Sequence, residues 1–155
     1  MQRIVLRRRP EGLVTWDDVE LVTVPVPVPG PGEALMHNEV LAIDASVRSW
    51  LSPAKGYLPP VELGEAVRCS SAGRVVATDC EAYGIDDVVT SLAAWEEYSI
   101  VRDDLFTTWL PRDADLIPMI SIYGATGTTA LLGLTEIGRP KAGEEIGKMA
   151  QRHVP

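Results

Sequence analysis

The side chains that most often bind metals or act as nucleophiles are few and far apart in this chain. There are two cysteines, Cys69 and Cys80, and two histidines, His37 and His153. A structural zinc site takes four ligands, and neither histidine has a cysteine, an aspartate or a second histidine at ligand spacing. We therefore expect no metal site. Both cysteines are interpreted as small, partly buried residues with no assigned role.

Large aromatic side chains point to a different kind of site, a pocket for a small molecule. Trp50, Trp95 and Tyr123 are suited to line an apolar pocket, as aromatic residues often do. A place in the hydrophobic core explains them without any ligand, and for Trp95 the core is the better interpretation. The residue types alone leave both roles open.

The composition is that of an ordinary globular protein. The chain has 155 residues, of which 46% are hydrophobic and 23% charged, enough for one compact domain with a core. The net charge of −8 argues against a nucleic-acid partner, which needs clustered cations. No run approaches the roughly 18 apolar residues of a membrane-spanning helix, and no apolar segment follows the basic N-terminus as in a secretory signal. We expect no membrane association and a cytoplasmic location.

Short strands separated by turn residues make up the first hundred residues. Proline at every second position from Pro25 to Pro31 favours an extended path on a surface or an edge. Many short strands with Gly, Pro and Asp between them indicate a barrel rather than a doubly wound sheet. The expected strands are residues 3–8, 19–24, 33–43, 73–78, 87–90 and 97–101.

The pattern becomes helical after Pro111. A short helix is expected near Pro118, because proline is tolerated in the first helical turn. Thr126 is the expected N-cap of a second helix, and Gly138 is its expected stop. Apolar residues recur between them at helical spacing, at Ala130, Leu131, Leu134 and Ile137. The predicted fold class is therefore mainly β with a helical C-terminal segment.

Six segments between residues 2 and 144 resemble known sequence motifs. They are 25–33, 44–48 (D-A-S-V-R), 55–64, 72–76 (A-G-R-V-V), 95–98 (W-E-E-Y) and 124–144 (G-A-T-G-T-T-A, then I-G-R-P-K-A-G-E). In this order they resemble the N-terminal domain of zinc-independent medium-chain reductases, in the branch that reduces alkenal, prostaglandin and curcumin double bonds. Each motif is weak alone, and the ordered set is specific.

The resemblance implies a GroES-like barrel that forms a substrate pocket. In full-length relatives a Rossmann domain follows and delivers hydride from NADPH to an activated C=C bond. The zinc-dependent branch is disfavoured, because Ser70 stands where a zinc-binding histidine is expected. On this basis residues 1–112 are expected to form the barrel, 113–143 a helical hinge segment and 144–155 an atypical tail in place of the nucleotide-binding domain.

The sequence departs from the family where the cofactor would bind. After Gly143 and Glu144 the family has a β-strand and a glycine-rich turn that holds the pyrophosphate at a helix N-terminus. Residues 145–155 match neither feature. We expect no cofactor for this chain alone, and NADPH only if a Rossmann partner supplies the nucleotide site.

The resemblance also selects ligand-binding candidates in the pocket-forming loops. With the aromatic candidates Trp50 and Tyr123, the loop residues Ser46 and Arg48 are the expected substrate-binding residues. Thr129 matches a position that contacts the nicotinamide, a role it would have only if a partner supplied the nucleotide. Structural roles remain open, since Arg48 could brace a loop and Thr129 could be a hydroxyl on a helix surface.

Three further residues near the expected pocket are candidates for proton transfer. They are Asp44, Tyr57 and Glu65. An apolar pocket raises the pKa of a carboxyl group toward neutrality, which suits a general acid or base. Surface or turn positions for the two carboxylates remain the competing interpretation.

The second expected helix has an apolar stripe that would pack against the second domain in the family. The stripe consists of Leu131, Leu132, Leu134 and Ile137. Left exposed, it is too apolar for an isolated monomer. We therefore expect a homodimer or a partner chain that covers it.

Three functions remain open at this point. The first is a small-molecule enzyme that acts on a hydrophobic carbonyl or enone substrate without hydride transfer, as an isomerase, cyclase or dehydratase. The second is the substrate-binding half of an NADPH-dependent double-bond reductase, which needs a separate nucleotide-binding partner. The third is a non-catalytic binding or remnant domain. The matched pocket loops favour the first two, and the missing glycine turn favours the first over the second.

Overall fold

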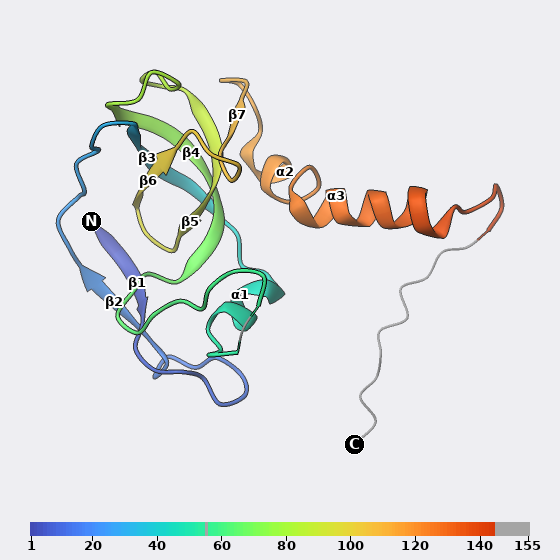
Figure 1. Cartoon of the computed structure of the whole chain (residues 1–155), viewed down its shortest axis with the longest axis horizontal. Coiled ribbons are helices and arrows are strands. Elements are labelled where there is room, and N and C mark those ends of the chain that lie inside the picture. The colour runs from blue at the N-terminus through green and yellow to red at the C-terminus, as the bar shows by residue number, and fades with distance from the viewer. Residues whose placement is uncertain (55, 145–155) are drawn as a thin grey trace.

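The computed structural model describes residues 1–54 and 56–144, and strands dominate it (Figure 1). The strands are β1 (Gln2–Leu6), β2 (Val19–Thr23), β3 (Glu33–Leu41), β4 (Arg68–Thr78), β5 (Val88–Ala94), β6 (Tyr98–Arg102) and β7 (Thr108–Leu110). The helical elements are α1 (Ala45–Trp50), α2 (Leu116–Ile120), α3 (Ala125–Leu132) and η1 (Gly133–Gly138). The predicted class, mainly β with a helical C-terminal segment, is confirmed. All but the first residue of the predicted tail lies outside the described residues.

Five strands form one antiparallel sheet in the order β6-β3-β4-β5-β7. The pairing of β3 with β4 shifts register between Leu35 and Met36, and again between Asn38 and Val40. Such bulges bend a strand and increase its twist. Gly73 lies at the second shift, where a Cβ atom would come 1.9 Å from the backbone oxygen of His37. Only glycine therefore allows this close approach of the two strands.

The strands β1 and β2 form a second, two-stranded antiparallel sheet. The backbone nitrogen of Ile4 donates to the carbonyl of Trp95 at 2.8 Å, and that of Glu97 donates to the carbonyl of Gln2 at 3.1 Å. These bonds attach the pair to the connection between β5 and β6. In the described residues the strands therefore form a curled open sheet with an attached pair, and they do not close into a hydrogen-bonded ring as a complete barrel would (Figure 1).

Three clusters of buried side chains hold these elements together. The first joins β1, β2 and α1 around Leu6 and Leu51, and Trp95 packs against it. The second lies within the large sheet and includes Met36. The third places Leu116 of α2 against Ala72, Val88 and Leu110 of the sheet. The indole nitrogen of Trp95 donates to the carbonyl of Ala42 at 3.3 Å, consistent with a place in the core.

The two predicted C-terminal helices are present, but the second begins earlier than expected. Asp115 caps α2 by accepting a hydrogen bond from the backbone nitrogen of Ile117. The N-cap of α3 is Gly124, which has an extended backbone, so the prediction of Thr126 as N-cap is wrong. Gly127 explains the position of the helix start. A Cβ atom there would come 1.6 Å from the backbone oxygen of Ile122, so the first turn of α3 lies directly against the end of the preceding segment.

The last described helical segment carries no buried residue. α3 and η1 run on without a break and project away from the sheet (Figure 1). The helix ends after Gly138, as predicted, and Arg139 takes the left-handed conformation there, with its backbone nitrogen donating to the carbonyl of Leu134 at 2.7 Å. The apolar side chains of this segment are therefore left facing solvent.

No helix in the described part of the chain is long and apolar enough to cross a membrane. Over the same residues, no three His, Cys, Asp or Glu side chains come together as metal ligands. Cys69 and Cys80 are free thiols, and burial raises the pKa of Cys69 to about 12. Cys69 is therefore a protonated core residue at neutral pH.

Candidate functional site

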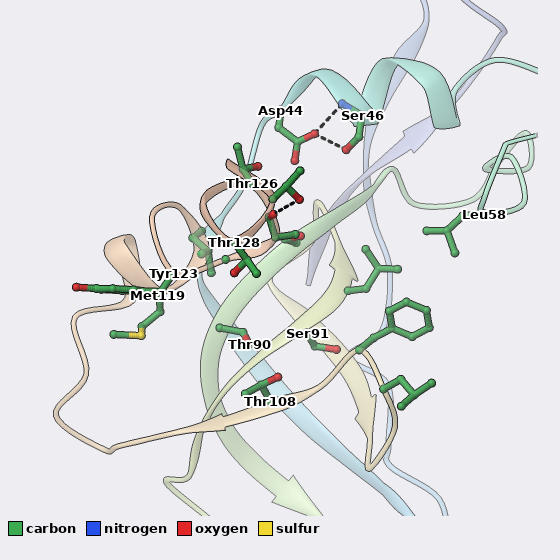
Figure 2. Close-up of a pocket in the computed structure, with 18 of the residues that line it drawn as sticks. Asp44, Ser46, Leu58, Thr90, Ser91, Thr108, Met119, Tyr123, Thr126 and Thr128 are labelled. Carbon is green, nitrogen blue, oxygen red and sulfur yellow. Dashed lines mark hydrogen bonds between the residues drawn. The ribbon is translucent and has the colours of Figure 1, made fainter. Parts of the chain in front are cut away.

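A cavity of about 910 Å³ lies between the large sheet, the start of α1 and the segment that joins α2 to α3. Ligand pockets for small molecules fall in this range of volume. Figure 2 shows the side chains that converge on it. From α1 and the following loop they are Asp44, Ala45, Ser46, Trp50, Tyr57 and Leu58; from the sheet and its loops Ser70, Thr90, Ser91, Leu92, Leu105, Phe106, Thr108 and Leu110; from the helical segment Met119, Ile120, Tyr123, Gly124, Ala125, Thr126, Thr128 and Thr129.

Asp44 and Ser46 occupy the corner of the cavity at which α1 begins. The Oδ1 atom of Asp44 accepts a hydrogen bond from the backbone nitrogen of Ser46 at 2.7 Å and another from the Ser46 hydroxyl (Figure 2). Asp44 is therefore the N-cap of α1, where a carboxylate satisfies a free backbone donor. Its side chain is exposed, so the burial expected for a general acid in an apolar pocket is not present.

Trp50 and Tyr57 form an aromatic wall at the other end of α1. Trp50 is buried, whereas Tyr57 is 77% exposed. Their rings meet edge to face, with centroids 6.2 Å apart and planes at 71°. The guanidinium carbon of Arg68 lies 5.8 Å from the centroid of the Trp50 ring, in cation–π range. The indole is thus held between the core and the cavity, whereas the phenol ring is largely exposed.

The helical segment supplies the opposite wall. Tyr123 is exposed on it, and its backbone nitrogen donates to the carbonyl of Pro118 at 2.9 Å. Thr126 and Thr128 present hydroxyl groups from the first turn of α3 (Figure 2). Thr129 also borders the cavity, and its Oγ1 donates to the carbonyl of Ala125 at 2.7 Å. The hydroxyl of Thr129 is therefore already engaged with its own helix.

Sequence reasoning missed the polar residues that the sheet contributes. Thr90, Ser91 and Thr108 line the cavity from β5 and β7 (Figure 2). Ser91 is buried, and its hydroxyl lies 2.9 Å from that of Thr107. Threonine and serine in strands carry no signal of their own, because they are common in β-structure. Thr90 and Thr108 are direct partners in the pairing of β5 with β7, which places both side chains on the same face of the sheet.

Two of the predicted site residues lie outside the cavity wall. The Arg48 side chain turns toward an N-terminal loop, where Nε donates to the carbonyl of Gly12 at 2.8 Å and Nη2 to that of Pro10 at 3.0 Å. Glu65 is exposed, and its backbone carbonyl accepts from the nitrogen of Leu6 at 2.9 Å. The structure thus places Asp44, Ser46, Trp50, Tyr57, Tyr123 and Thr129 at one cavity and leaves Arg48 and Glu65 away from it.

A family model described as the N-terminal domain of oxidoreductase matches residues 2–108. The chain belongs to this family. Among curated proteins, it is 33% identical to a putative NADP-dependent oxidoreductase, YfmJ, of Bacillus subtilis and 30% identical to the NADPH-dependent curcumin reductase of Escherichia coli. Each match covers 94% of this chain and 42% of the relative. The chain thus spans about two fifths of the length of these oxidoreductases.

Solved structures of the same family share the fold. The crystal structure of CurA from Vibrio vulnificus matches with a TM-score of 0.83 at 28% identity, over 90% of this chain and 41% of that one. Its complex with NADPH matches with a TM-score of 0.81 over 91% of this chain. The resemblance inferred from the motifs, including the GroES-like N-terminal domain of medium-chain oxidoreductases, is confirmed by these matches.

Proposed function

We propose that this chain is the substrate-binding domain of an NADPH-dependent reductase of activated C=C bonds, and that the cavity holds a hydrophobic carbonyl substrate. The observation that carries the proposal is the composition of the cavity wall. Leucine, methionine and aromatic side chains line the cavity and would surround an apolar ligand, and serine and threonine hydroxyls lie among them. A ligand with an apolar body and one carbonyl oxygen has the matching chemistry.

The hydroxyl groups of the cavity would donate hydrogen bonds to the carbonyl oxygen of the substrate. Hydride addition to an enone places negative charge on that oxygen, and hydrogen-bond donors aimed at it stabilise the charge as it develops. Thr90 and Thr128 line the cavity and are donors of this kind, whereas the Ser46 hydroxyl already donates to Asp44. Trp50, Tyr57 and Tyr123 would enclose the apolar body of the substrate. Tyr57 is a phenol at the cavity that could pass a proton from solvent to the enolate carbon after the hydride step.

NADPH fits the described residues only in part. The part of the chain that the structure describes has no glycine-rich turn between a strand and a helix, the arrangement that binds a pyrophosphate. Thr129 borders the cavity and could lie near a nicotinamide. The phosphate end of the cofactor would therefore be held by a nucleotide-binding domain, whether continuous with this chain or separate from it.

The redox-independent activity expected from the sequence is not supported. That hypothesis needed a carboxyl group with an acid–base role inside an apolar pocket. Asp44 is exposed and caps α1, and Glu65 lies outside the cavity wall. Membership of an oxidoreductase family and the match to a curcumin reductase favour the substrate half of a reductase instead.

A chimera tests this function directly. Residues 1–144 of this chain would replace the equivalent segment of Vibrio vulnificus CurA, with which they share the fold. We expect the chimera to oxidise NADPH in the presence of curcumin or 4-phenyl-3-buten-2-one. The isolated chain should bind 4-phenyl-3-buten-2-one, seen as shifts of cavity amides in ¹⁵N spectra, and should not oxidise NADPH.

The controls separate folding from function. NADPH binding by the chimera, measured by calorimetry, shows that its nucleotide-binding half is intact. A chimera that binds NADPH but reduces neither enone, while intact CurA reduces at least one, would overturn the proposed function. It would favour a non-catalytic binding domain.

A further inference from the structure

The cavity wall is almost free of formal charge. Among the described residues that line it, Asp44 is the only Asp, Glu, Lys, Arg or His. The remaining polar side chains are the hydroxyls of serine, threonine and tyrosine and the indole of Trp50. No arginine or lysine belongs to this described wall, so an anion in the cavity would find no countercharge on it.

Two guanidinium groups on elements that border the cavity form hydrogen bonds outside it. Arg48 belongs to α1, but both of its described bonds go to carbonyls of the N-terminal loop. Arg68 stacks over Trp50 and donates to the carbonyl of Pro59 at 2.8 Å. Neither of these two arginines lines the cavity. Turning either one inward would break bonds that hold a loop in place.

Transfer of a carboxylate group from water into this cavity therefore costs more free energy than transfer of a neutral carbonyl group. Leaving water is unfavourable for an anion unless a cation or several donors replace its hydration. Repulsion by the Asp44 carboxylate adds to this cost. A ketone, aldehyde or ester oxygen needs only one or two hydroxyl donors, and the wall offers several.

We infer that the cavity selects neutral carbonyl ligands and rejects carboxylates of the same shape, and that Asp44 contributes to this specificity. The inference rests on the proposed function, because it assumes that this cavity is the substrate site. Figure 2 shows Asp44 beside Ser46 at the start of α1, and Thr126 and Thr128 on the first turn of α3. A ligand bound by those hydroxyls would lie within the field of the Asp44 carboxylate.

A matched ligand pair provides the test. Methyl cinnamate and cinnamate have the same conjugated body and differ in a neutral ester against an ionised carboxylate at pH 7.5. Titration of the ¹⁵N-labelled full chain gives both dissociation constants and locates the ligands by the shifts of Ser46 and Thr128. We expect the ester to bind at least about tenfold more tightly than the acid.

Two substitutions test the role of Asp44. Asp44→Asn removes the charge and keeps a good helix N-cap, so α1 is preserved. Asp115→Asn makes the same change at the N-cap of α2, outside the cavity wall. We expect D44N to reduce the preference for the ester by about threefold, and D115N to leave it unchanged.

The possible results distinguish the two proposals. If methyl cinnamate does not bind at the cavity, the proposed function and the inference both fail. If the ester binds and the acid binds as tightly, the inference alone is overturned. If D44N changes the preference no more than D115N does, the part assigned to Asp44 is wrong.

Discussion

Arg48 shows how a residue at the expected position can serve the fold instead of the ligand. Two nitrogens of its guanidinium group donate hydrogen bonds to the carbonyls of Pro10 and Gly12. These bonds attach the N-terminal loop to α1. The same loop exposes Leu13 and Trp16, at 89% and 87%. Lysine cannot make the two-pronged contact, because its ammonium is a single point of donation.

We therefore predict that Arg48→Lys loosens the loop and leaves ligand binding intact. Chymotrypsin should cleave near Leu13 and Trp16 several times faster than in the unaltered chain, followed by mass spectrometry. The affinity for 4-phenyl-3-buten-2-one should stay within about twofold. A large loss of affinity without faster cleavage would instead place Arg48 in the substrate site.

The Asp18 carboxylate makes a contribution to the free energy of unfolding that depends on pH. The Arg8 guanidinium donates to its Oδ1 at 2.7 Å, and Thr15 donates to Oδ2 through its nitrogen and its hydroxyl. These bonds lower the pKa of Asp18 from 3.8 to about 2. A pKa that is lower in the folded state stabilises the fold above the unfolded value, and the gain disappears as the pH falls toward the folded value.

Asp18→Asn should lower the melting temperature by a few degrees at pH 7. The difference in melting temperature between the variant and the unaltered chain should disappear as the pH falls from about 4 to about 2. Thermal unfolding followed by circular dichroism measures both. Asp17→Asn is the matched control, because the Asp17 side chain is 81% exposed and lies 3.7 Å from Arg8. A gap that does not change with pH would contradict the linkage.

At the level of elements, local residue patterns predicted most of the strands. The helix α1 and the strand β7 depend on contacts between residues far apart in the sequence. The strands follow from β-branched residues between glycine, proline and aspartate turns, and each expected strand has a counterpart within a few residues. The helix α1 was not predicted. It is six residues long and buries only Val47 and Trp50, too little for a helical period to be visible. The strand β7 has three residues and depends on pairing with β5.

The cavity could be predicted only as far as the family motifs extend. The motifs pointed to Asp44, Ser46 and Tyr57 because these lie in segments with a recognisable order of residues, and Trp50 was selected as a large aromatic residue. The hydroxyls of Thr90 and Thr108 come from directly paired residues of β5 and β7, and this register places them on one face of the sheet. No local pattern in the sequence encodes the pairing of these two strands.

The junction of α2 and α3 depends on a glycine, and this provides a test of how the cavity is shaped. Gly127 has no room for a side chain, because a Cβ atom would lie 1.6 Å from the oxygen of Ile122. Gly127→Ala should push the first turn of α3 away from the end of α2. Since that turn carries Thr126 and Thr128 into the cavity, we expect a several-fold loss of affinity for 4-phenyl-3-buten-2-one.

Gly133→Ala is the control for this substitution. Its Cβ atom would meet nothing within 4 Å, and the residue is helical. Alanine there should raise the helix content slightly and leave binding unchanged. Amide shifts of residues 123–128 in ¹⁵N spectra should move in G127A and stay in place in G133A. Equal binding by both variants would show that the position of α3 does not shape the ligand site.

For the whole molecule, the main unexplained feature is a helix whose apolar side chains are left exposed by the residues that the structure describes. The segment from Ala125 to Gly138 has no buried residue, although a helix of this length is marginal in water on its own. Its apolar side chains are exposed: Leu131 (60%), Leu132 (54%), Leu134 (40%) and Ile137 (84%). In an intact reductase a second domain would cover this face. In a solution of the 155-residue chain alone, a second copy offers an apolar surface of the same kind.

We therefore predict that the chain associates with itself at micromolar concentration through this helical face. Ile137→Glu places a charge in the contact and should weaken the association at least tenfold, measured by sedimentation or light scattering. Leu13→Glu is the matched control, because it makes the same kind of change at another exposed apolar residue. If L13E dissociates the assembly and I137E does not, the contact lies on the N-terminal loop. A chain that is monomeric without any substitution would show that the exposed helix is stable alone, contrary to this prediction.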